Sequence, residues 1–79
     1  MIKKCKAPYG VSPIQGVVDG EDQSNKHNTR QSIVKKGESV TVVTTKQAEV
    51  KTGSGIISGK VSVVTIAEKP GWYLASAFA

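Results

Sequence analysis

The stretch GKVSVVTIAEKPGWYLASAF, residues 59–78, decides how this chain folds. Its run from Val61 to Ala67 is rich in β-branched residues, which predicts a strand because branched side chains pack well on a pleated surface. A turn containing Pro70 and Gly71 follows and delivers the only tryptophan, Trp72. We expect one short 3₁₀ turn in the small residues that come next. The upstream residues then read as strands that wrap around this segment.

The upstream half contains further extended segments separated by turn residues. In Val40 to Thr45, alternation places Val40, Val42 and Thr44 on one face and the intervening residues on the other. Gly53-Ser54-Gly55 predicts a hairpin loop, and Gly59 predicts a bulge or bend. With the weaker segments at residues 2–7, 32–34, 48–52 and 56–57, the pattern predicts about five short strands.

A long polar segment from Tyr9 to Arg30 interrupts the strands. Several glycines and prolines break regular structure in it, so we expect a long loop that is either mobile or functional. The loop also holds half of the carboxylates of the chain, which are Asp19, Glu21 and Asp22.

Size and composition favour a single all-β domain, residues 1–79. Leucine and methionine occur once each, at Leu74 and Met1, so a helical core is not expected. The net charge is +5 and the positive charges are mostly lysines spread along the chain. Dispersed lysines usually keep a small domain soluble and protect strand edges, although a surface for nucleic acid is an open alternative.

Little in the sequence points to catalysis or to a bound metal. Cys5 and His27 are the only residues of their types, which excludes an internal disulfide and falls short of a four-ligand zinc site. No Walker-type phosphate loop is present. We therefore expect no enzyme activity and no cofactor. The first residues lack the apolar part of a secretion signal and no apolar run could span a membrane, so the expected location is cytoplasmic.

Two segments resemble bacterial SH3-like domains of the SH3b type. SIVKKGESVTVV (residues 32–43) is similar to their short strand, diverging turn and Val-rich strand, and KVSVVTIAEKPGWYLASAFA (residues 60–79) is similar to their C-terminal part. The resemblance implies a small barrel of about five strands, with residues 9–30 as the RT-type loop and Ala75-Ser76-Ala77 as the 3₁₀ turn. It also implies a bacterial or phage protein that binds a ligand without catalysis.

The leading hypothesis is a groove that binds a protein or peptide. Trp72 and Tyr73 are adjacent, so on a strand one should face the core and the other the surface. An exposed aromatic ring beside the long loop suits extended peptides, which lose little entropy on docking. The predicted site consists of an aromatic set, Tyr9, Trp72, Tyr73 and Phe78, and the acids Asp19, Glu21 and Asp22, which could pair with a basic ligand.

Three alternatives stay open. Nucleic acid could bind to a lysine-rich face made of Lys35, Lys36, Lys46, Lys51 and Lys60. Cell-wall peptide binding is what the resemblance implies for exported relatives, and the N-terminal sequence argues against it. Association of the chain with itself is also open, because a small barrel leaves strand edges.

Overall fold

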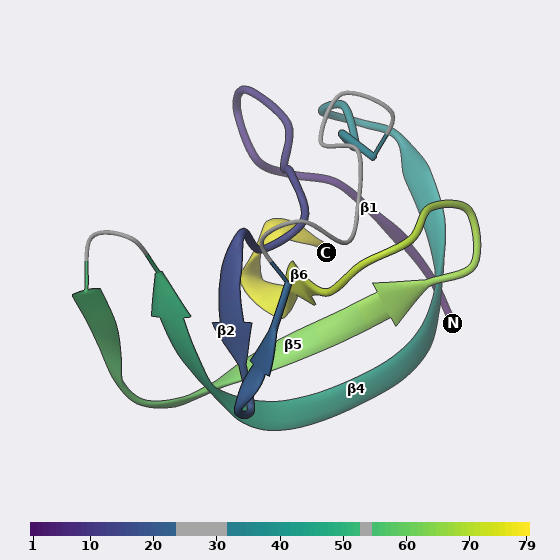
Figure 1. Ribbon diagram of the computed structural model, residues 1–79. Coiled ribbons are helices and arrows are strands. Elements are labelled where there is room, and N and C mark those ends of the chain that lie inside the picture. Colours follow the sequence, from purple (N-terminus) through teal and green to yellow (C-terminus); the bar gives the residue numbers. More distant parts are fainter. Residues whose placement is uncertain (24–31, 53–54) are drawn as a thin grey trace.

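Strands make up most of the part of the chain that the computed structural model describes, which is residues 1–23, 32–52 and 55–79 (Figure 1). This confirms the expected all-β class, and no α-helix occurs in these residues. The one helical element is a 3₁₀ helix, η1 (Ala75–Ala77), where the small residues predicted it. The strands are β1 (Ile2–Lys4), β2 (Gly16–Val18), β3 (Glu21–Asp22), β4 (Ser39–Thr52), β5 (Gly55–Ile66) and β6 (Tyr73–Leu74).

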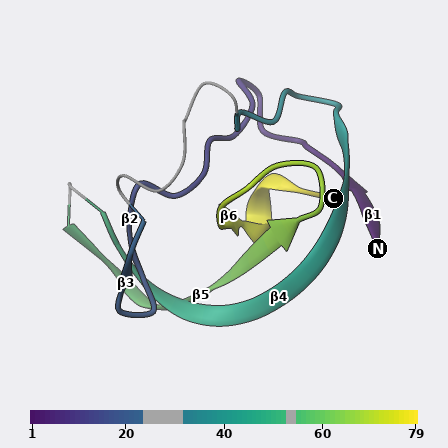
Figure 2. The same cartoon turned by 45° about the vertical axis from the view of Figure 1, so that its right-hand side comes forward.

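The strands form an antiparallel sheet in the order β3-β2-β4-β5-β6. The sheet is organised around the long β4–β5 pair, and Figure 2 shows that β4 curves strongly along the outside of β5. On its other edge, β4 pairs with β1 at one end and with β2 at the opposite end. No helix in the described residues is long and apolar enough to cross a membrane.

β4 is one continuous strand where the sequence predicted two. It joins the segments 40–45 and 48–52, and a register shift lies between Val42 and Thr44. Val42 lies opposite Ile66 and Thr45 lies opposite Val64, and both of these partners belong to one buried cluster. The shift therefore changes which residues face that cluster, and the expectation of unbroken alternation through Thr44 is wrong.

Two buried clusters cover the two faces of β5. The first contains Cys5, Val34, Val40, Val64, Ile66, Tyr73, Ala77 and Phe78. The second contains Ile14, Val18, Ala48, Val50 and Val63, with Val61, Trp72 and Leu74 partly buried against it. The neighbours Val63 and Val64 belong to different clusters, as expected for side chains that alternate along a strand. Each fully buried valine contributes about 1.5–3 kcal/mol, so a core poor in aromatics still stabilises the fold.

Tyr73 anchors the first cluster. Its side chain is 0% exposed, and its ring packs edge-on against Phe78 with centroids 6.1 Å apart. The hydroxyl donates a hydrogen bond to the carbonyl of Ser32 at 2.7 Å and lies 3.1 Å from the carbonyl of Pro70. Burial raises the pKa of Tyr73 to about 12, although the hydrogen bond to Ser32 opposes this shift. The residue thus ties the turn after β5 to the segment before β4.

The first and last described residues pair with each other. Lys4 and Ala79 exchange two backbone hydrogen bonds of 3.0 and 2.9 Å, and the N–H of Lys6 donates to the carbonyl of Ala77 at 2.8 Å. Between them, Cys5 lies opposite Phe78 and is buried, with its thiol directed at the carbonyl of Val34. The strand predicted for residues 2–7 therefore ends at Lys4, and the residues after it pair with residues 77–78 outside any named strand.

The long polar segment begins with a hairpin that the sequence analysis missed. β2 and β3 are joined by Asp19 and Gly20, whose φ values are 54° and 82°. Positive φ at both central residues defines the type I′ turn that Asp-Gly favours in two-residue hairpins. The segment 32–34 contributes only a bridge between Val11 and Val34 rather than a strand. Residues 24–31, which include His27, and residues 53–54, which belong to the predicted hairpin loop, lie outside the described residues.

Candidate functional site

The predicted aromatic groove does not form as expected. Tyr73 and Phe78 pack against each other inside the first cluster, where they are 0% and 5% exposed. A ligand at the surface therefore cannot reach either ring. Tyr73 itself pairs with Val64 of β5 and Phe78 itself pairs with Cys5, and both partners belong to the first cluster.

Trp72 is the predicted aromatic residue that lies partly at the surface. It packs against the second cluster, on the side of the sheet opposite Tyr73, which confirms that the two neighbours face different ways. The ammonium group of Lys46 lies 4.7 Å from the centre of the Trp72 ring and 3.4 Å from the Asp19 carboxylate. The fold thus brings Asp19 close to Trp72, with Lys46 as the link.

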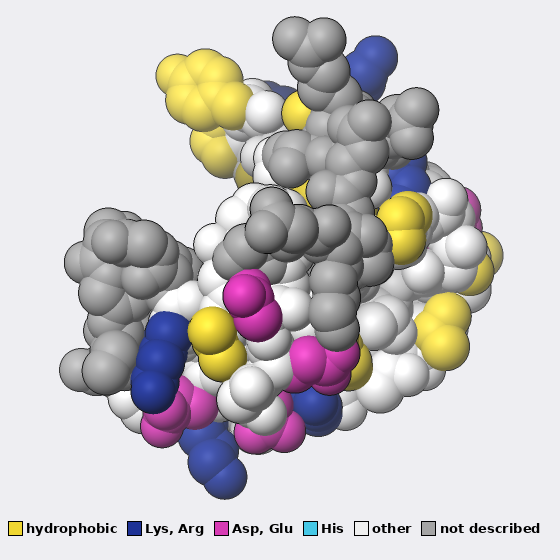
Figure 3. Space-filling model, viewed as in Figure 1, with side chains coloured by type: hydrophobic (Ala, Val, Ile, Leu, Met, Phe, Trp, Pro, Cys, Tyr) yellow, Lys and Arg dark blue, Asp and Glu magenta, His cyan; other side chains and the backbone are white. Residues whose placement is uncertain are grey.

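The other predicted residues are placed apart from this contact. Tyr9 is 99% exposed on a separate turn. Glu21 and Asp22 form β3 at the edge of the sheet, and both are exposed. Figure 3 shows acidic and basic side chains intermixed on this face, over β2, β3 and the adjoining end of β4.

The lysines proposed for nucleic acid do not form one basic face. Lys46 pairs with Asp19, and Lys51 lies 3.8 Å from Glu49. Lys60 lies directly across the ladder from the same Glu49. These three lysines therefore stand among carboxylates. The remaining two, Lys35 and Lys36, lie in the turn before β4.

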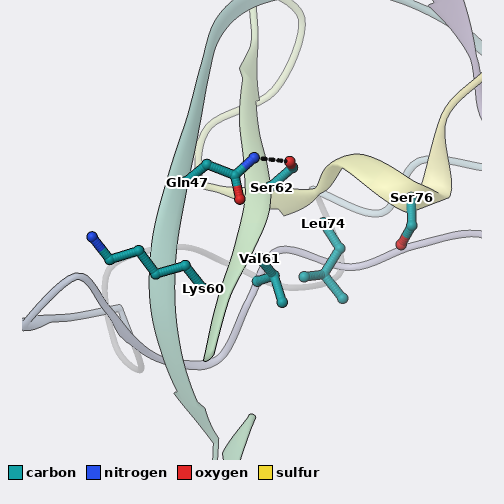
Figure 4. A pocket seen from close by; sticks show the side chains of 6 residues that line it. All are labelled: Gln47, Lys60, Val61, Ser62, Leu74 and Ser76. Carbon is teal, nitrogen blue, oxygen red and sulfur yellow. Dashed lines mark hydrogen bonds between the residues drawn. The ribbon is translucent and has the colours of Figure 1, made fainter. Parts of the chain in front are cut away.

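A hollow of about 470 Å³ opens beside β5. Its lining comes from the middle of β4, from β5 and from the β6–η1 junction, and the residues are Gln47, Lys60, Val61, Ser62, Leu74 and Ser76 (Figure 4). The side chains of Val61 and Leu74 lie side by side, and both pack against the second cluster. Gln47 donates a hydrogen bond to the hydroxyl of Ser62 on the rim. The hollow therefore has an apolar floor and a polar rim.

The end of β6 explains why the hollow forms at this place. Leu74 pairs with Val63, after which the chain turns into η1 instead of following β5. On that side of residues 60–62, no described strand continues the sheet. The residues of this hollow come from three separated segments, so no local sequence pattern predicts it. The one relevant signal is the short length of the WYL segment before the small residues, which indicates an early strand end.

The backbone of β5 directs hydrogen-bonding groups to this open side. The backbone carbonyl of Glu49 accepts a hydrogen bond from the N–H of Asp19, so the backbone groups of Glu49 point toward β2. The backbone groups of its neighbour Ala48 then point the other way, toward β5. The direction of the backbone hydrogen-bonding groups alternates along a strand. Val61 lies opposite Ala48, so its N–H and carbonyl point toward β4. The N–H and carbonyl groups of Lys60 and Ser62 then point away from β4, and those of Lys60 lie beyond the last pair between β5 and β6, which is Val63 with Leu74.

The groups that line the hollow are those that commonly recognise a ligand. Among the described residues of its lining, Lys60 is the only titratable side chain. Among the described residues, no three His, Cys, Asp or Glu side chains gather where they could hold a metal ion. An apolar floor, hydroxyl and amide groups on the rim and the outward-pointing backbone of β5 suit an extended chain.

Comparison with known proteins adds no relative. The chain matches no protein-family model, no curated protein and no solved structure.

Proposed function

We propose that this chain is a non-catalytic binding module that takes an extended polypeptide segment into the hollow beside β5. The observation that carries the proposal is the coincidence of the hollow with a stretch of β5 that no described strand covers. Unpaired strand edges accept an added strand, and an adjacent pocket gives such an addition its sequence preference.

Binding would proceed by strand addition. The backbone of the incoming segment hydrogen-bonds to Lys60, in the place that a longer β6 would occupy. Alternate side chains of an added strand point to one face, so one of them enters the hollow between Val61 and Leu74. An apolar side chain suits this floor, and burying it supplies about 1.5–3 kcal/mol.

We also propose that the fold is a small barrel of the SH3-like kind that the sequence resembles. Continuous backbone pairing supports this: β1 pairs with β4, β4 with β5 and β5 with β6, and residues 77–79 return to the segment that follows β1. The position of η1 between β6 and the final pairing matches the order that the resemblance implies. A solved structure of the chain would test this assignment directly.

Peptide selection followed by amide NMR tests the proposed function. Peptides enriched from a displayed random library are titrated into the labelled protein, and shifts are expected at residues 60–62, Leu74 and Ser76. Ser76→Trp places a bulky ring on the rim and should abolish binding. The control is Ser39→Trp, an exposed serine at the start of β4 that lines no part of the hollow.

The two variants separate the outcomes. If selected peptides bind Ser76→Trp as well as they bind the wild type, or shift residues elsewhere, the hollow is not the binding site.

A further inference from the structure

Tyr9 stands on a hydrogen-bonded turn that holds its ring entirely in solvent. The N–H of Gly10 donates to the carbonyl of Ala7 at 3.1 Å, which closes the turn, and Pro8 fixes the backbone angle before Tyr9. Reciprocal hydrogen bonds of 2.8 Å between Val11 and Val34 hold the base of the turn. Because the backbone under this 99% exposed ring is already anchored, a ligand that contacts the ring does not have to order the turn as well.

Four exposed lysines lie on this turn's own segment and on the segment that runs beside it. A Cβ atom built on Gly10 would lie 3.5 Å from the Cα of Lys35, and the N–H of Gly37 donates to the carbonyl of Cys5. The segments 5–11 and 34–37 therefore run side by side, as Figure 2 shows near the top of the molecule. We call the exposed side chains of these segments, with the neighbouring Lys4, the Tyr9 patch: Lys4, Lys6, Tyr9, Lys35 and Lys36.

The lysines of the Tyr9 patch are less closely paired with carboxylates than Lys46 and Lys51 are. Among the described residues, none of its four ammonium groups is ion-paired with a carboxylate. The nearest acid, Glu38, accepts the backbone N–H of Lys35 at 3.2 Å and pairs with Lys69 at 3.2 Å. In contrast, Lys46 and Lys51 each stand beside a carboxylate. The Tyr9 patch therefore brings together four lysines that form no ion pair among the described residues, and Glu38 acts electrostatically on one of them, Lys35.

We propose that the Tyr9 patch is a binding site for single-stranded nucleic acid, separate from the hollow beside β5. The lysines would contact successive phosphates, and one unpaired base would stack on the Tyr9 ring. A single strand is favoured over a duplex because the faces of duplex bases are already stacked on their neighbours. A lone, fully exposed ring between lysines also distinguishes this ligand from an acidic peptide, which offers carboxylates but no base to stack.

Fluorescence anisotropy with a labelled 15-nucleotide oligothymidylate tests the site, with a duplex of the same length and poly-glutamate as competitors. We expect Tyr9→Ala to weaken binding at least fivefold and Tyr9→Phe to leave it nearly unchanged, since stacking contributes about 1–3 kcal/mol per base. Lys36→Gln should reduce the slope of log K against log salt by about 0.7, the value for one phosphate of a single strand. Lys51→Gln removes the same charge outside the patch and should leave the slope unchanged.

Each other outcome overturns the proposal. Equal loss of affinity in Lys36→Gln and Lys51→Gln would mean that only net charge matters. Competition by poly-glutamate as strong as by unlabelled oligothymidylate, with no effect of Tyr9→Ala, would identify a site for acidic protein segments. Preference for the duplex would exclude stacking on Tyr9. Amide spectra of the variants establish that each is folded, which we expect because the substituted side chains are exposed.

Discussion

Replacing Tyr73 with phenylalanine tests the central anchor of the fold by removing one oxygen atom. The substitution keeps the ring and its edge-on contact with Phe78, so packing in the first cluster changes little. What disappears is the hydroxyl that bonds the carbonyl of Ser32 at 2.7 Å and lies 3.1 Å from that of Pro70.

The expected loss follows from these contacts. A net hydrogen bond contributes about 0.5–1.5 kcal/mol, and a buried carbonyl left without its donor costs about 1–3 kcal/mol. We therefore expect Tyr73→Phe to lower the free energy of unfolding by about 2 kcal/mol, which corresponds to a fall in Tm of roughly 8–16 °C for a domain of this size. Urea titration followed by tryptophan fluorescence measures it, since Trp72 is the only tryptophan.

The pH dependence supplies a second readout. The pKa of Tyr73 is raised from 10.0 to about 12 in the folded chain, so folding favours the neutral hydroxyl. The stabilisation that the hydroxyl provides is complete below pH 10 and is lost as the pH rises through 12. The difference between wild type and Tyr73→Phe should therefore shrink over that range. Lysine titration affects both proteins alike and cancels in the comparison.

Tyr9→Phe is the matched control, because it removes the same atom from a residue that is 99% exposed. It should change the free energy of unfolding by less than about 0.5 kcal/mol. The reasoning is refuted if Tyr73→Phe is no more destabilising than Tyr9→Phe, or if its difference from wild type is the same at pH 8 and pH 11.5.

Three further experiments test other contacts by substitution. The hydroxyl of Ser32 is buried without a hydrogen-bond partner among the described residues, so Ser32→Ala should leave stability unchanged or raise it by about 1 kcal/mol in urea titration; a clear loss would show that the hydroxyl is bonded. Gly10→Ala should lower the melting temperature more than Gly20→Ala does. Both glycines have φ near +80°, but only the new Cβ at Gly10 would clash, 2.7 Å from the carbonyl oxygen of Val34. Equal melting temperatures of the two variants would contradict this. A hydrogen bond from the backbone of Lys35 lowers the pKa of Glu38, so its ionised form stabilises the fold above pH 4.5. The difference in free energy of unfolding between wild type and Glu38→Gln should therefore shrink as the pH falls below that value. Acid titrations of the two proteins that stay parallel would exclude this contribution.

Local patterns predicted the elements whose signals are contained within a few residues. The β-branched runs at residues 40–45 and 61–66 are strands, and Gly59 lies at an irregularity of β5 with φ +71°. The Asp19-Gly20 pair carried an equally local signal for a hairpin, but the surrounding glycines and acids read as a loop. A short hairpin inside a polar segment is easily missed for that reason.

The candidate site could not be predicted because pairing decides it. Alternation places Trp72 and Tyr73 on opposite faces but does not say which face is the core, and the sheet buries Tyr73 against Phe78. The register shift in β4 likewise has no signature in a run of valines and threonines. The hollow depends on where β6 stops along β5, which no single segment encodes.

The hydrogen bonds between Lys4 and Ala79 join segments from the two ends of the sequence. Contacts of such wide separation form late and slow the search for the native state, because nearly the whole chain must be ordered to bring them together. The same proximity makes the molecule suited to head-to-tail cyclisation, since a short peptide linker would connect neighbours rather than cross the surface. A cyclised chain would keep these segments close even when unfolded, and should therefore refold faster than the linear one.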